Sequence, residues 1–151
     1  MTAIPSPRDA ARARERRSEL LAVADEGPLV ALAERCLDEG TAVTVLAGPE
    51  VGVVALQVRE PIARERFHLG EALVTQVEVD VDGHRGWAMR LGDDRVATLA
   101  AAVLDAVAAA GHRLAAEVDA LCATTETARH AADAAEWADI APTEVRFEEL
   151  D

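Results

Sequence analysis

The sequence predicts an α+β fold: two N-terminal helices, a four-stranded antiparallel meander, two further helices and a short last strand. Apolar residues recur every three or four positions in the helical segments, and the repeat changes to alternation in the middle of the chain. The dipeptide Asp82-Gly83 lies between two alternating stretches and is a strong hairpin signal. At 151 residues we expect one domain, with a helical part (1–40), a meander (41–92), a second helical part (93–141) and a strand with an acidic tail (142–151).

The first helix is predicted from its start signal. Ser6-Pro7-Arg8-Asp9 resembles a capping box with Pro at the first helical position, so a helix should run from near residue 7 to about Ala24. Gly27-Pro28 ends it, and Pro28 opens a second helix that Gly40 closes. The second helix has apolar residues at helical spacing: Leu29, Leu32, Ala33, Cys36 and Leu37.

The meander is predicted from alternation and turn residues. We expect strands at 42–46, 51–59, 66–81 and 84–91. The turn between the first two strands is assigned to Gly48-Pro49-Glu50, and an irregularity is expected at Leu69-Gly70 in the third strand.

Two helices follow the meander. The first has a clear apolar stripe and ends at Gly111: Val96, Leu99, Ala100, Val103, Leu104 and Val107. The second should run from about Arg113 to Trp137, with core-sized inner residues in its first half and Ala in its second. Such an Ala face packs only against a very close backbone or under a partner. Pro142 stops this helix, and 143–147 should form the last strand, with Val145 and Phe147 on one face.

Charge and composition exclude several classes of protein. A net charge of −13 and a pI near 4.6 argue against binding to nucleic acid or to an anionic membrane. We predict no membrane span, no signal peptide and a cytoplasmic location, with Cys36 and Cys122 as buried thiols. An Arg cluster in the first helix is either a basic arm for a phosphate or acidic partner, or a solvated face paired with nearby acids: Arg8, Arg12, Arg14, Arg16 and Arg17.

The sequence contains no self-contained catalytic motif. It has no nucleophile elbow, no Gly-rich phosphate loop and no Lys for one. His130 shares a helix face with Glu126 and Asp133, a spacing that suits a metal and equally suits a solvated polar face. No further His or Cys lies nearby, so we predict no catalytic, metal or cofactor-binding residue, and no enzyme that acts alone.

The segment from Glu65 to Glu71 has unusual chemistry for a strand. Arg66 and Glu71 flank Phe67 and Leu69, and Gly70 permits a close backbone approach. The segment is either an ordinary edge strand with an ion pair or a surface for docking another chain, because exposed strand edges accept partners.

Several of these motifs resemble one known family. The run Glu65-Arg66-Phe67 followed by Gly70-Glu71 at the start of a strand, then Gly86-Trp87, Gly92-Asp93 and 143–147, is similar to the G subunit (PhnG) of the bacterial carbon–phosphorus lyase core complex. The resemblance covers most of the chain beyond about residue 40. The N-terminal helix pair matches in type only.

The resemblance implies an accessory, non-catalytic subunit of a transferase complex in phosphonate catabolism. In this family the G subunit joins the subunits PhnI, PhnH and PhnJ, with PhnL, in a two-fold symmetric assembly. The assembly transfers an alkylphosphonate to C1′ of its substrate ATP and releases adenine. The chain would bind no cofactor alone. Gln76 and Asp93 stand where the family often has Arg, which argues against direct triphosphate binding by this face.

We therefore expect a subunit interface formed by residues of the third and fourth strands and of the last strand: Arg66, Phe67, Gly70, Glu71, Thr75, Gly86, Trp87, Val145 and Phe147. We expect two copies, as a homodimer or within a two-fold symmetric complex. The alternative function is a free acidic homodimeric binding module like a secretion chaperone, which the size and low pI permit. A third reading, a small hydrolase, lacks a nucleophile or metal set.

Overall fold

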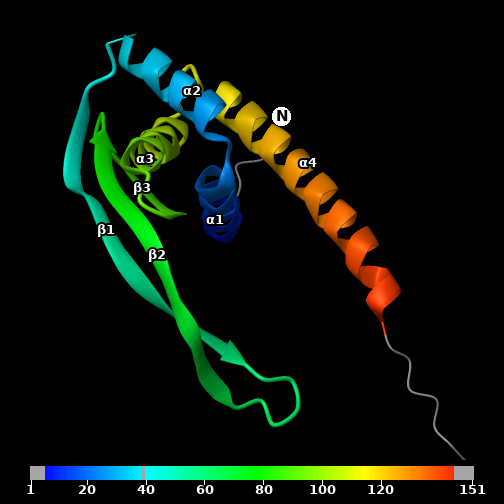
Figure 1. The fold of residues 1–151 in the computed structure, drawn as a ribbon. Helices are drawn as coiled ribbons and strands as arrows, with labels where there is room; N and C mark the ends of the chain where they lie inside the picture. Colours follow the sequence, from blue (N-terminus) through cyan, green and yellow to red (C-terminus); the bar gives the residue numbers. More distant parts are fainter. Residues whose placement is uncertain (1–5, 39, 145–151) are drawn as a thin grey trace, which may run out of the picture.

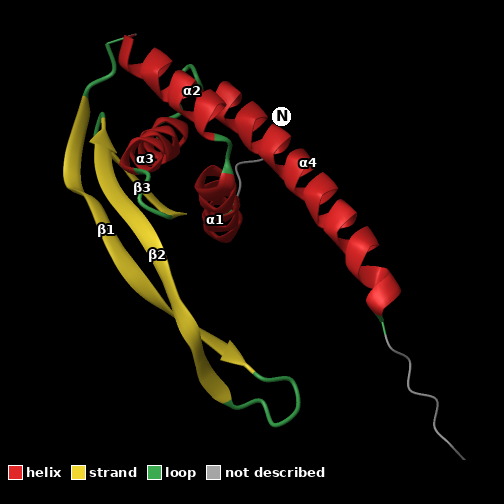
Figure 2. Ribbon diagram, in the orientation of Figure 1, coloured by secondary structure: helices red, strands yellow, loops and turns green. Residues whose placement is uncertain are grey.

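The computed structural model describes residues 6–38 and 40–144 and confirms the α+β class. Figure 2 shows helices at both ends of the chain and strands between them. The elements in order are α1 (Pro7–Val23), α2 (Glu26–Asp38), β1 (Val43–Arg59), β2 (Arg66–Val81), β3 (His84–Leu91), α3 (Arg95–Ala109), α4 (Ala115–Ile140) and the short 3-10 helix η1 (Ala141–Thr143).

The predicted start of the first helix is confirmed, whereas the second begins before Pro28 and the last begins at Ala115 instead of about Arg113. Ser6 caps α1 by accepting a hydrogen bond on Oγ from the backbone N–H of Asp9 at 3.3 Å, and Pro7 is the first helical residue. Asp94 caps α3 in the same way, with Oδ1 accepting from the N–H of Ala97 at 2.9 Å. The second helix starts two residues before Pro28, which lies within its first turn. Backbone N–H groups in the first turn have no intrahelical acceptor, so the lack of an N–H on Pro28 costs no hydrogen bond.

The sheet has three antiparallel strands in the order β1-β2-β3, so the prediction of four strands is wrong. At Gly48-Pro49-Glu50 the chain does not reverse. It keeps its direction through two register shifts against β2, and the two predicted strands form the single strand β1. Gly48 fits this irregularity with φ +80°, and a Cβ there would lie 2.5 Å from the carbonyl oxygen of Gln76.

The other two strand predictions are confirmed with their bounds. Asp82 and Gly83, with φ values of +51° and +83°, form the hairpin that pairs Val81 with His84. The predicted irregularity near Leu69-Gly70 is also present, as a register shift opposite Leu56 and Gln57.

Helix α3 is the centre of the packing. It contacts all three strands on one side and α1, α2 and α4 on the other (Figure 1). Its stripe residues Val103, Leu104 and Val107 are buried, together with Val77 and Val79 of β2. The core is thus a sheet, a central helix and a second helical layer.

Two parts extend beyond this core. Strand β3 pairs only with Val74–Val81 of β2, so residues 53–73 of the β1–β2 hairpin continue as a two-stranded ribbon, which we call the arm (Figure 1). Helix α4 is buried at Val118 and Cys122, whereas every residue from 127 to 140 is exposed.

The predicted last strand is wrong at its first residue, because Thr143 belongs to η1. There the chain forms one more helical turn, the 3-10 helix η1, instead of an extended strand. Glu144 follows η1 as its C-cap and is in no described strand, and residues 145–147 of that prediction lie outside the described part of the chain. In residues 6–38 and 40–144, no helix is long and apolar enough to cross a membrane.

Candidate functional site

The arm carries a concentration of exposed apolar side chains. Val53 and Leu69 have 62% and 60% of their surface exposed, and Phe67 and Leu73 are close to half exposed. Ile62, in the loop between the two strands, is 92% exposed. An isolated two-stranded ribbon is marginally stable in water, and exposed apolar patches on folded proteins mark interaction sites. The arm is therefore the candidate interaction surface.

The loop at the end of the arm is held by a carboxylate. Glu60 Oε2 accepts a hydrogen bond from the backbone N–H of Ile62 at 2.8 Å, and this bond lowers the pKa of Glu60. The backbone N–H of Glu60 also donates to the carbonyl oxygen of Glu65 at 3.0 Å. The loop thus holds the most exposed of these apolar side chains in a defined place.

Four of the predicted interface residues lie on the arm. Arg66 stands opposite Arg59, Phe67 opposite Val58, and Glu71 opposite Ala55. Gly70 pairs with Leu56 beside the register shift. No ion pair between Arg66 and Glu71 is present in the described structure. The register instead pairs Arg66 with Arg59, and like charges directly opposite each other on two strands are unfavourable.

Three others lie in the body of the protein. Thr75 is fully buried and donates a hydrogen bond from Oγ1 to the carbonyl oxygen of Gly92 at 2.8 Å. Gly86 is buried where α3 crosses β3, and a Cβ there would lie 2.0 Å from the carbonyl oxygen of Ala102. Trp87 is 44% exposed. Thr75 and Gly86 therefore position the sheet and present no side chain to a partner.

Val145 and Phe147 lie outside the described residues, so their part in the interface stays a prediction.

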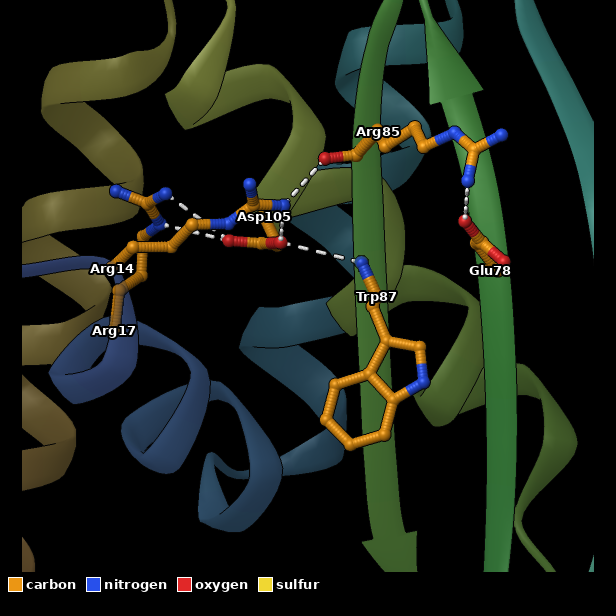
Figure 3. Close-up of polar contacts among 6 residues, drawn as sticks. All are labelled: Arg14, Arg17, Glu78, Arg85, Trp87 and Asp105. Atoms are coloured by element: carbon orange, nitrogen blue, oxygen red, sulfur yellow. Dashed lines mark hydrogen bonds and ion pairs between the residues drawn. The ribbon is translucent and has the colours of Figure 1, made fainter. Parts of the chain in front are cut away.

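A buried carboxylate that sequence reasoning missed joins three elements. Asp105 of α3 is 1% exposed and accepts hydrogen bonds from Arg14 at 2.8 Å, from Arg17 at 3.1 Å and from the backbone N–H of Trp87 at 3.2 Å (Figure 3). Arg14 also donates to the carbonyl oxygen of Arg85. The signal for this site was a lone Asp directly after the apolar pair Val103-Leu104.

The Asp105 site explains much of the N-terminal Arg cluster. Two of its guanidinium groups bind Asp105, and Arg16 binds both Glu19 and Glu126. Among the acidic residues close to this cluster in the sequence, Glu19 forms an ion pair with it, through Arg16. Arg14, Arg16 and Arg17 therefore fasten α1 to α3 and α4.

The polar face around His130 is also partly committed to structure. The hydrogen bond from Arg16 lowers the pKa of Glu126 and keeps it ionised as an ion-pair partner. Among residues 6–38 and 40–144, no group of three or more His, Cys, Asp or Glu side chains is placed to hold a metal ion. Burial raises the pKa of the Cys122 thiol, which disfavours the thiolate needed for nucleophilic chemistry.

A shallow groove of about 790 Å³ lies where the turn between α1 and α2 meets α4. Its lining is mostly small or apolar, including Val23, Pro28, Leu121, Ala128 and Ala132. The predicted Ala face of α4 is thus open in the described structure.

These features identify the general class of protein to which the chain belongs. The described residues form an acidic α+β domain whose exposed apolar side chains gather on a projecting arm, as in proteins that work by assembling with others.

Comparison with known proteins gives the family. A family model described as "Phosphonate metabolism protein PhnG" matches residues 12–150, and this chain belongs to that family. The chain is also 33% identical, over 150 residues, to the "Alpha-D-ribose 1-methylphosphonate 5-triphosphate synthase subunit PhnG" of Rhizobium meliloti (strain 1021). That similarity covers 97% of this chain and 94% of the relative, so it includes the N-terminal helices. The predicted resemblance is confirmed.

Proposed function

We propose that this chain is the PhnG subunit of an α-D-ribose 1-methylphosphonate 5-triphosphate synthase, in which it acts as an accessory structural subunit. The observation that carries the proposal is the near full-length similarity to a protein of that name. The exposed apolar arm adds independent support, because a subunit needs a surface by which to assemble.

The reaction of the complex joins an alkylphosphonate to the ribose of ATP. A phosphonate oxygen attacks C1′, the glycosidic bond to adenine breaks, and adenine leaves with the bonding electron pair. The 5-triphosphate stays on the ribose. ATP is therefore a substrate of the assembly and not a cofactor of this chain, whose exposed chemistry suits docking more than bond transfer.

The partners in this proposal are PhnI, PhnH and PhnJ, with PhnL acting in the same step, and two copies of this chain in a two-fold symmetric assembly. The location is cytoplasmic, where ATP is supplied and where the free thiols of Cys36 and Cys122 stay reduced. Arg66, Phe67 and Glu71 are the candidates on the arm for this interface.

Co-expression tests the proposal. The tagged chain is produced with PhnH, PhnI and PhnJ, and the purified material is analysed by size-exclusion chromatography and native mass spectrometry. We expect a stable complex that contains this chain, and adenine release from ATP that depends on methylphosphonate, on PhnL and on this chain.

Two variants and one control locate the interface. Phe67→Ala should weaken the complex by roughly tenfold in Kd, the usual effect of losing an interface anchor, and Arg66→Glu tests whether the charged side of the arm also contributes. Arg95→Glu changes an exposed Arg at the start of α3, outside the arm, and should leave assembly intact. If the other subunits assemble without this chain while it remains a discrete homodimer, the free binding-module function replaces this proposal.

A further inference from the structure

We propose that the arm docks through one face only, the face continuous with the side of the sheet turned away from α3. The occupant is another subunit of the synthase that presents an apolar strip beside basic side chains. The inference rests on the proposed function and adds to it the surface used and the chemistry of the partner.

The two faces of the arm follow from burial and register. In β2, Thr75, Val77 and Val79 are buried against α3, so even-numbered residues from 74 onward point to the opposite side. Gly52 pairs with Val74, which places Val54, Leu56 and Val58 of β1 on that opposite side too. We call this side of the arm the outer face.

The outer face is apolar along its whole length. Ala72 and Gly70 pair with Val54 and Leu56, and beyond the register shift Phe67 pairs with Val58. The shift leaves Leu69 without a partner in β1, and by alternation with Phe67 it lies on the same face. The outer-face strip therefore consists of Val54, Leu56, Val58, Phe67, Leu69 and Ala72.

The other face carries the apolar pair Val53 and Leu73 next to the body and becomes polar only towards the end of the arm. Gln57 pairs with His68, and Arg59 pairs with Arg66. If both faces of the arm were in water, there would be no physical reason for one face to be apolar and the other polar at the end of the arm. Burial of one face under a partner supplies that reason. In the described residues no helix of this chain covers the outer-face strip, so the covering element comes from another molecule.

The charge at the inner end of the outer face identifies the partner's chemistry. Three acidic residues lie on this face between the strip and the Asp82-Gly83 hairpin: Glu50, Glu78 and Asp80. Arg85 neutralises only part of their charge, through an ion pair with Glu78 at 2.9 Å. A matching surface carries Arg or Lys beside an apolar strip. A second copy of this chain fits badly, since each copy carries a net charge of −13 and brings the same carboxylates.

Paired variants on the two faces test the inference. Leu69→Asp places a charge on the outer face and Val53→Asp places one on the other face of the same arm, and both wild-type side chains are about equally exposed, at 60% and 62%. Binding of each tagged variant to the co-expressed partner subunits is measured by surface plasmon resonance. We expect Leu69→Asp to raise the Kd at least roughly tenfold, and Val53→Asp to raise it less than about threefold.

Two further measurements make the outcome unambiguous. Thermal melting of each free variant should match the wild type, because both side chains are already in water. Glu50→Arg should raise the Kd by roughly threefold to tenfold and reduce its dependence on salt, since it reverses a charge beside the strip.

Each result decides the inference. If wild type binds and the two Asp variants bind equally well, the one-face docking is wrong while the proposed function stands. If wild type binds none of the partner subunits, both proposals fail. If the free chain is a homodimer that Leu69→Asp dissociates, the occupant is a second copy and the inference is overturned.

Discussion

The body of the protein and its arm are built from the same apolar residues and treat them in opposite ways. Val77 and Val79 of β2 are at most 1% exposed beneath α3, whereas Val53 and Leu69 on the arm are 60% exposed or more. Full burial of a Val or Leu side chain contributes about 1.5–3 kcal/mol. The body gains this free energy on folding, whereas on the exposed arm it is not gained by folding and would be available to an association. The difference arises from coverage by α3 and not from strand composition.

The largest effect should come from adding one methyl group to the body. In Gly86→Ala the new Cβ would lie 2.0 Å from the carbonyl oxygen of Ala102 and 2.7 Å from the backbone nitrogen of Ala106, so α3 must move away from β3. We expect the free energy of unfolding to fall by about 3 kcal/mol or more, measured by urea denaturation. The matched change Gly52→Ala, where β1 enters the arm, meets open space and should stay within about 0.5 kcal/mol. Equal losses would contradict the distinction between body and arm.

A smaller loss should follow removal of the carboxylate that joins α1, α3 and β3. Asp105→Ala leaves the N–H of Trp87 and the partly buried Arg17 without their acceptor, while Arg14 is 45% exposed and regains water. We expect a loss of about 2–3 kcal/mol in the same assay. Glu78→Ala breaks the exposed ion pair with Arg85 on the outer side of the sheet and should change stability by less than about 1 kcal/mol. A larger effect for Glu78 than for Asp105 would refute this account.

The smallest effect concerns acid stability. Hydrogen bonds from Arg35 and Arg16 lower the pKa values of Glu117 and Glu126 in the folded protein. A carboxyl with a lowered folded-state pKa stabilises the fold above its unfolded pKa, and this contribution is lost as the pH falls through the folded pKa. In melting curves between pH 7 and pH 3, Glu126→Gln should therefore show a shallower decline in Tm than wild type.

The arm offers the matched control for this pH experiment. The pKa of Glu60 is also lowered, by the backbone N–H of Ile62, but this loop lies at the far end of the arm from the helices (Figure 1). Glu60→Gln should leave the global melting profile unchanged. An acid limb flattened by Glu60→Gln as much as by Glu126→Gln would show that the arm unfolds together with the body.

Much of the fold was predictable because its signals are local. Ser6-Pro7 and Asp94 begin helices where a side chain accepts orphan backbone N–H groups, and Asp82-Gly83 forms its hairpin because both residues accept positive φ. The stripe of α3 was correct from Leu99 to Val107, whereas Val96 in the first turn is 62% exposed. The error at Gly48-Pro49 has a physical cause, because Gly and Pro favour both turns and bulges. Here pairing with Gln76–Val81 of β2 on both sides of the dipeptide produces an irregularity within one strand and not a turn.

The candidate site was predictable only in part. The sequence singled out the segment from Arg66 to Glu71, and the structure places it on the arm, while its role as an interface stays a prediction. Burial of Thr75 and Gly86 depends on the approach of α3, which is a tertiary contact without a local signal. The two Arg partners of Asp105 lie about 90 positions away in the sequence, so their pairing with it could not be read from spacing.

Helix α4 is one continuous helix whose two halves differ in burial. Its first half is anchored by Val118, Cys122 and the ion pair between Arg16 and Glu126, whereas every residue from 127 to 140 is exposed. Amide protons along α4 should therefore exchange with solvent at rates that rise steadily from Val118 towards Ile140, since isolated helical turns open without global unfolding. The two halves of α4 are therefore expected to differ in how often they open, although they form one continuous helix.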